Sequence, residues 1–218
     1  LLLLLFNGAA FGNVALIPIS GPITGNGGKY LGQPTVSSAD VISYIEEANE
    51  NPQVQAIVLE INSPGGSAVA SDEIAAAVKK SKKPVVSLIQ EVGASGGYWI
   101  ASSTELIVAN RMSITGSIGV ISSYLEFSGA MEKYGVGYER LVAGKNKDIG
   151  TPFKKLSDAE KSLFQGKLDR IHQYFIQEVA ENRNLPESAV ITAATGEFFL
   201  GVEAQELGLV DKLGDIST

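Results

Sequence analysis

Ser95 is the residue whose surroundings in the chain most favour covalent chemistry. It lies in the run Gly93-Ala94-Ser95-Gly96-Gly97-Tyr98, where small residues on both sides let a substrate backbone approach the hydroxyl closely. A serine in such a turn is typical of a nucleophile, provided that a base takes its proton. The usual base is histidine, but the only one, His172, lies far downstream in an amphipathic helical pattern that favours a structural role. The base is therefore expected to be another residue.

Lysine can fill that role when its amine is neutral, as in the serine-lysine variants of the hydrolytic triad. Three lysines compete for it: Lys145, Lys147 and, with less support, Lys133. The first two lie in Gly144-Lys145-Asn146-Lys147-Asp148, just after a strand that the pattern predicts near residues 137–142. Alternation would place both side chains on one face, so the residues alone leave the choice between them open.

A second glycine turn, Asn62-Ser63-Pro64-Gly65-Gly66, follows an apolar strand predicted at 54–61 and precedes a helical pattern. Backbone N–H groups at the start of a helix have no intrahelical partner. Serine acyl transfer needs two such donors aimed at the developing oxyanion, and the natural pair is Gly66 N–H with that of Ser95 or Gly96. Two Ser/Gly turns that each follow a strand favour this interpretation over ordinary turns.

The elements that must position these turns alternate along the chain. Val- and Ile-rich runs predict strands at 14–19, 54–61, 85–89 and 106–109. Apolar spacing predicts helices at 38–48, at 71–80, from the capping box at Ser157 to about Arg183, and at 203–207. Such β-α-β-α alternation indicates an α/β fold with parallel strands and covering helices.

Composition narrows the function classes. A chain of 218 residues that is 44% hydrophobic can bury one substantial core, so we expect a single domain over residues 13–218. The net charge of −7 argues against nucleic acid as a partner. The lack of cysteine excludes disulfides, thiolate zinc sites and cysteine nucleophiles, and one histidine makes a catalytic zinc site improbable. We expect neither a metal nor a cofactor.

Residues 1–12 begin with five leucines and a phenylalanine. That apolar run is shorter than the roughly 20 residues that cross a bilayer. We interpret it as the end of an N-terminal membrane anchor or signal segment, with a short apolar arm packed on the body or on a neighbour as the alternative.

Four motifs in a fixed order resemble the signal peptide peptidase A group of membrane-associated serine proteases, whose core has the crotonase-like fold that Clp proteases also use. The resemblance covers nearly the whole chain. The motifs are the two glycine turns at 62–66 and 93–98, the run Thr115-Gly116-Ser117-Ile118-Gly119-Val120, and the lysine segment 144–148 followed by Thr151-Pro152-Phe153.

The resemblance assigns roles to individual residues and implies a crotonase/Clp-like repeated ββα core. Ser95 matches the nucleophile, and Lys147, directly before the aspartate, matches the general base. Ser117 matches a serine that orients the lysine amine. Gly66 matches an oxyanion-hole donor, and Gly96 is the second donor that we expect.

The resemblance also implies substrates and partners. Family members cleave hydrophobic peptides such as remnant signal peptides at or near a membrane, and the short members assemble into rings. We therefore expect a homo-oligomer that associates with a membrane, the cell membrane, through an N-terminal anchor.

Two other functions fit the same fold. One is a catalytically inactive scaffold that binds peptides without cutting them. The other is an acyl-CoA hydratase or isomerase, which usually needs a carboxylate base, and no glutamate occurs within the three glycine motifs. A Ser-His-Asp protease of the Clp type is disfavoured because His172 would have to leave its helix face.

Overall fold

A computed structural model describes residues 3–4, 13–30 and 32–218 of the chain. The chain forms two compact units: Leu1–Gly119 with Tyr174–Thr218 is the first, and Val120–Gln173 is the second. The predicted extent of one protease domain over 13–218 stays a prediction. The apolar stub proposed for residues 1–12 lies outside the described residues, apart from Leu3–Leu4.

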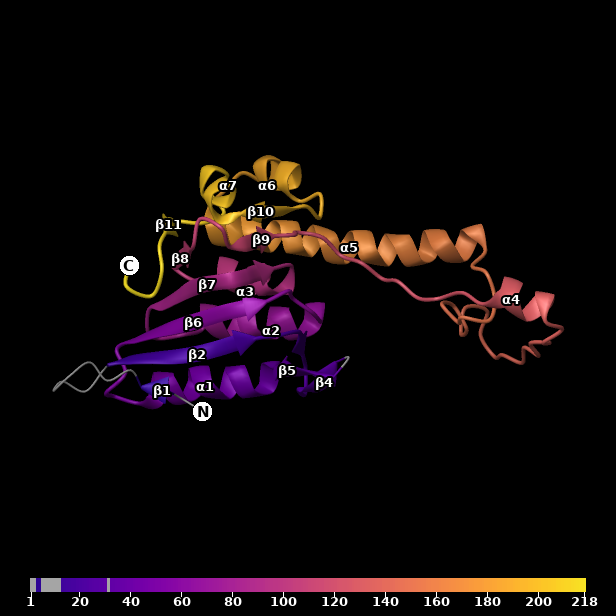
Figure 1. Cartoon of the computed structure of the whole chain (residues 1–218), viewed down its shortest axis with the longest axis horizontal. Helices are drawn as coiled ribbons and strands as arrows, with labels where there is room; N and C mark the ends of the chain where they lie inside the picture. The colour runs from indigo at the N-terminus through magenta and orange to yellow at the C-terminus, as the bar shows by residue number, and fades with distance from the viewer. Residues whose placement is uncertain (1–2, 5–12, 31) are drawn as a thin grey trace. The chain divides into compact units, whose positions relative to one another are not determined.

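A mostly parallel sheet organises the first unit (Figure 1). Four neighbouring strands run parallel in its centre: β2 (Val14–Ser20), β6 (Ala56–Ser63), β7 (Val85–Ala94) and β8 (Leu106–Ala109). The edges are β1 (Leu3–Leu4), antiparallel to β2, and β11 (Lys212–Leu213), parallel to β8. The predicted α/β class with parallel strands is confirmed.

Two further short strands belong to this sheet, and three others form a sheet of their own. The end of β7 pairs with β9 (Ile114–Gly116), which in turn pairs antiparallel with β10 (Phe198–Leu200). A separate three-stranded sheet contains β3 (Ile23–Thr24), β4 (Gly28–Tyr30) and β5 (Gln33–Ser37). The sequence analysis did not predict these short strands.

Helices of the first unit pack against the sheet and share its core. The first three are α1 (Ser38–Glu50), α2 (Ala68–Lys79) and α3 (Gly96–Ser102). Ser37 and Ser67 cap α1 and α2 by accepting hydrogen bonds from backbone N–H groups of the first turn. Alternate residues of β6, namely Ile57, Leu59 and Ile61, are fully buried, as the period of a strand requires.

The C-terminal helices complete the covering layer. They are the end of α5 (Asp158–Arg183), from Tyr174 onward, with α6 (Glu187–Ala193) and α7 (Gly201–Glu206). Near the end of α5, Phe175 stacks on Trp99 of α3 with ring centroids 4.6 Å apart. Tyr98 of α3 is fully buried and donates a hydrogen bond of 2.9 Å to the carbonyl of Leu209. These contacts help to hold α3 in place.

The second unit contains α4 (Ser128–Lys133), the first half of α5 and connecting turns. The strand predicted near 137–142 is wrong, because the described chain has no regular structure there. Val136 and Leu141 are exposed. A β-strand needs a neighbour for its backbone hydrogen bonds, and this segment pairs with none among the described residues.

Hydropathy along the helices bears on the expected membrane anchor. Over the described part of the chain, none of the helices combines the length and the apolar character that crossing a bilayer demands.

The hydrogen bond from Tyr98 gives a test of how α3 is held. Tyr98→Phe should lower the free energy of unfolding by about 1–2 kcal/mol, because the buried Leu209 carbonyl loses its donor. Urea denaturation measures this change. Tyr44→Phe is the matched control, since no hydrogen bond of the Tyr44 hydroxyl occurs in the described part of the chain. An equal effect of both substitutions would contradict this account of α3.

Candidate functional site

Ser95 occupies a strained turn between β7 and α3. Its backbone has φ 52° and ψ −121°, a left-handed region that residues with a side chain rarely adopt. Two hydrogen bonds hold it there: Ser95 N–H donates to the carbonyl of Gly116 at 2.8 Å, and its own carbonyl accepts from Trp99 N–H at 2.9 Å. Strain of this kind costs about 1–3 kcal/mol and concentrates at functional sites.

The Gly65-Gly66 turn lies directly against the Ser95 turn. Gly65 has φ 95°, and a methyl group on it would lie 2.6 Å from the Gly96 nitrogen and 2.9 Å from Ser95 Cβ. A methyl group on Gly96 would in turn lie 3.3 Å from the Gly66 nitrogen. The structure thus brings Ser95, Gly66 and Gly96 together, and glycine is what permits the approach.

The side chain of Ser63 stabilises the Gly65-Gly66 turn through hydrogen bonds. Its buried hydroxyl accepts a hydrogen bond from Gly65 N–H at 3.1 Å and donates one to the carbonyl of Gly21 at 2.7 Å. The sequence analysis included Ser63 in the 62–66 motif but predicted no role for it. A short polar residue two positions before a glycine could have indicated this hydrogen bond.

The backbone donors around Ser95 differ in how they are used. Ser95 N–H is engaged by Gly116, as described above. Within the described residues, no protein acceptor takes a hydrogen bond from Gly66 N–H or from Gly96 N–H. Of the two partners that the sequence left open for Gly66, Gly96 is therefore the one with a free donor.

Ser117 lies next to this cluster. In the register of β7 with β9, Ala94 is opposite Gly116, so Ser95 and Ser117 follow neighbouring positions. Ser117 also has a positive φ, 49°, and its N–H donates to the carbonyl of Glu197 at 2.8 Å. Its hydroxyl donates to the carbonyl of Gly196 at 3.3 Å, which leaves oxygen lone pairs that can accept from an amine.

Lys147 belongs to the second unit. It is exposed in a series of tight turns, and its N–H donates to the carbonyl of Gly144 at 3.0 Å. Within the described chain, the Lys147 amine takes part in no hydrogen bond or ion pair. The placement of Lys147 beside Ser95 stays a prediction.

The two rival lysines have other surroundings. Lys145 lies in the same turns, and its carbonyl accepts a hydrogen bond from Arg140. Lys133 ends α4, and its amine lies 5.6 Å from the centre of the Tyr134 ring. His172 lies within α5, as predicted.

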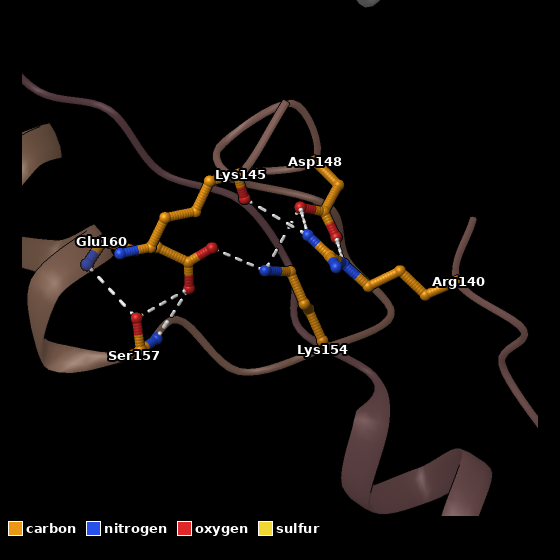
Figure 2. A network of polar contacts seen from close by, with 6 residues as sticks. All are labelled: Arg140, Lys145, Asp148, Lys154, Ser157 and Glu160. Atoms are coloured by element: carbon orange, nitrogen blue, oxygen red, sulfur yellow. Dashed lines mark hydrogen bonds and ion pairs between the residues drawn. The ribbon is translucent and has the colours of Figure 1, made fainter. Parts of the chain in front are cut away.

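A polar network joins the Lys147 segment to the start of α5 (Figure 2). Arg140 donates to both oxygens of Asp148, at 2.5 and 2.8 Å. The Lys154 amine lies 3.4 Å from Asp148 and 2.6 Å from Glu160. Glu160 and Ser157 form the predicted capping box, in which each side chain accepts from the other's backbone N–H. The sequence analysis found the box but not the ion pairs.

The cations of this network control the pKa values of its carboxyl groups. The hydrogen bond from Arg140 holds the pKa of Asp148 well below its usual range. The hydrogen bond from Lys154, followed by that from the Ser157 backbone, lowers the pKa of Glu160 to about 2. Both groups are therefore anionic at neutral and mildly acidic pH.

A groove described in the first unit lies away from these turns. It has a volume of about 560 Å³ and is lined by Leu88, Val92, Met112 and Ile114 among others, with Glu60 and Glu91 at its polar margin. None of the candidate residues lines it.

Gly65 allows a test of the contact between the two turns. Gly65→Ala should lower the free energy of unfolding by about 2–4 kcal/mol, because the new methyl group meets Gly96 N and the backbone must keep a positive φ. Gly25→Ala is the control, since a methyl group there has open space. Urea denaturation of both variants measures the difference. Equal stabilities would show that the turns are not in contact.

The network predicts a definite behaviour in acid. Because folding lowers the pKa of Glu160, its contribution to stability is present above about pH 4.3 and is lost as the pH falls toward about 2. Carboxyl NMR should show Glu160 still ionised at about pH 3, and Lys154→Met should return its midpoint toward about 4.3. A midpoint of about 4.3 in the unmodified protein would contradict the ion pair.

Comparison with known proteins identifies the family. The family model described as peptidase family S49 matches residues 77–218. The chain is 34% identical over 211 residues to a candidate signal peptide peptidase SppA of Enterococcus faecium, covering 95% of this chain and 61% of that protein. It is 30% identical to the chloroplastic serine protease SPPA of Arabidopsis thaliana, covering 91% of this chain and 29% of that protein.

A further relative is protease 4 of Haemophilus influenzae, 32% identical over 185 residues, which cover 83% of this chain and 30% of that protein. The chain thus spans at most about three fifths of the length of these relatives. The family match covers well over half of the chain, and the resemblance to the signal peptide peptidase A group is confirmed. This chain belongs to peptidase family S49.

Proposed function

We propose that this chain is a serine endopeptidase domain in which Ser95 is the nucleophile and Lys147 the general base. The observation that carries the proposal is the strained Ser95 turn, packed against Gly65-Gly66. Beside it, two backbone donors have no protein acceptor among the described residues. Family membership supports peptide hydrolysis as the reaction. Lys147 is proposed as the base because of the motif in which it lies, and because the sequence contains a single histidine.

The first half of the reaction forms an acyl-enzyme. The neutral Lys147 amine takes the proton of the Ser95 hydroxyl while the oxygen attacks the scissile carbonyl carbon. The N–H groups of Gly66 and Gly96 stabilise the oxyanion of the tetrahedral intermediate. The Lys147 ammonium then gives its proton to the leaving amine as the peptide C–N bond breaks.

The second half restores the enzyme. Lys147 takes a proton from water, whose oxygen attacks the acyl carbon, and returns that proton to Ser95 as the ester bond breaks. Ser117 accepts a hydrogen bond from the amine and orients it, a role that fits the free lone pairs on its hydroxyl. No metal or cofactor is required for these steps.

Substrates and partners follow from the relatives. One relative carries the name signal peptide peptidase, so hydrophobic peptides such as remnant signal peptides, cut at or near a membrane, are the proposed substrates. The second unit supports an assembly of several copies, because it exposes large apolar side chains that a neighbouring copy would cover. These residues are Ile121, Leu125, Tyr134, Val136 and Leu141.

Labelling with a fluorophosphonate probe tests the nucleophile and the base together. Unmodified protein should be labelled at Ser95, whereas Ser95→Ala should not be labelled, and Lys147→Ala should react about 1,000-fold more slowly. Lys145→Ala is the matched control and should keep most of the rate. Mass spectrometry locates the adduct.

The outcomes separate the candidate functions. Labelling of Lys147→Ala at the full rate would rule out Lys147 as the base. A large loss of labelling rate in Lys145→Ala would assign that role to Lys145. An unmodified protein that binds hydrophobic peptides but is never labelled would be the inactive scaffold.

A further inference from the structure

Arg140 contacts Lys145 and Asp148, which lie on either side of Lys147 in the sequence (Figure 2). Its Nη2 atom donates to the carbonyl oxygen of Lys145 at 3.3 Å, two residues before the base. Its Nε and Nη2 atoms donate to the carboxylate of Asp148, one residue after it. A planar guanidinium with a fixed fork of donors can make these contacts at once, so one side chain fixes both flanks of the lysine.

Lys154 attaches the same segment to a rigid element. Its amine lies 3.4 Å from Asp148 and 2.6 Å from Glu160, which forms the capping box in the first turn of α5. Ion pairs therefore help to hold the lysine segment. A functional side chain needs such support to keep its geometry.

The ion pairs of Asp148 also bear on the Lys147 amine. Asp148 is the sequence neighbour of Lys147, and a carboxylate at this distance can pair with an amine and keep it protonated. In the structure, Arg140 and Lys154 already occupy that carboxylate. Other charged groups near the segment are the cation of Lys145 and the carboxylate of Glu160, which is paired with Lys154.

We propose that Arg140 is a positioning residue for the base: it holds the peptide segment that carries Lys147 and keeps Asp148 from pairing with the Lys147 amine. This inference rests on the proposed function, in which Lys147 activates Ser95. It adds a residue that the motifs do not mark, because Arg140 lies outside all four of them.

Four variants of the full chain test the role: Arg140→Met, Arg140→Lys, Arg140→Met combined with Asp148→Asn, and the control Arg170→Met. Arg170 is exposed on α5 and outside the network. The readouts are the rate of fluorophosphonate labelling at Ser95 and kcat and KM for a hydrophobic peptide, with circular dichroism to establish folding.

Arg140→Met should label about 10- to 100-fold more slowly, with the loss in kcat and little change in KM, since the base is displaced and paired. Arg140→Lys should also be about tenfold slower, because one ammonium cannot make all three contacts. The double variant should be several-fold faster than Arg140→Met, since the freed carboxylate is gone. A residue needed only for folding would not produce that recovery.

Each alternative result is decisive. Folded Arg140→Met that labels at the unmodified rate, while Lys147→Ala labels about 1,000-fold more slowly, overturns the role of Arg140 and leaves the proposed function intact. A double variant no faster than Arg140→Met overturns the protection of Lys147 from Asp148. If Arg140→Met does not fold, Arg140→Lys decides, and a full rate overturns the proposal. Full labelling of Lys147→Ala would mean that the proposed function itself fails.

Discussion

The left-handed backbone of Ser95 is the constraint on which the candidate site depends. A residue with a side chain stays at φ 52° only if its surroundings hold it there. The pairing of β7 with β9 supplies the bond from Ser95 N–H to Gly116, and the start of α3 supplies the bond from Trp99 to the Ser95 carbonyl. These bonds engage Ser95 N–H, whereas the next donor, Gly96 N–H, has no acceptor in the part of the chain that the structure describes.

The two units hold their functional residues by different forces. In the first, all seven residues of α3 are buried, and the turn that precedes it is fixed by packing and by close backbone approach at glycine. In the second, α4 has no buried residue, and the Lys147 segment is held by charge-assisted hydrogen bonds. The proposed nucleophile, on a packed turn, and the proposed base, on a polar segment, should therefore respond to different substitutions.

Most of the fold was accessible from the sequence because its central strands are apolar and its helices carry caps. The strand at 106–109 was predicted with the observed bounds, and the helix from Ser157 was found from its capping box. Helix α3 was missed because its glycines and short length give no helical period, and tertiary packing decides its conformation. The segment 137–142, wrongly predicted as a strand, has strand-like residues but pairs with no strand that the structure describes.

The sequence predicted the two glycine turns of the candidate site but not the network of ion pairs around Asp148. Glycine and serine at 62–66 and 93–98 indicated the close approach that the structure shows, since few other residues permit it. Arg140, Lys154 and Glu160 are ordinary charged residues in sequence. Only the folded chain brings Arg140 and Lys154 to Asp148, and Glu160 to Lys154. Ion pairs between distant residues have no local signature, so spacing could not reveal them.

A crystal structure of the protein with a fluorophosphonate bound to Ser95 is the most direct test of the central claim, because the phosphonyl oxygen takes the place of the oxyanion. The account predicts that this oxygen lies about 2.7–3.1 Å from both the Gly66 and Gly96 nitrogens. A phosphonyl oxygen that points to solvent, or to donors elsewhere, would contradict it.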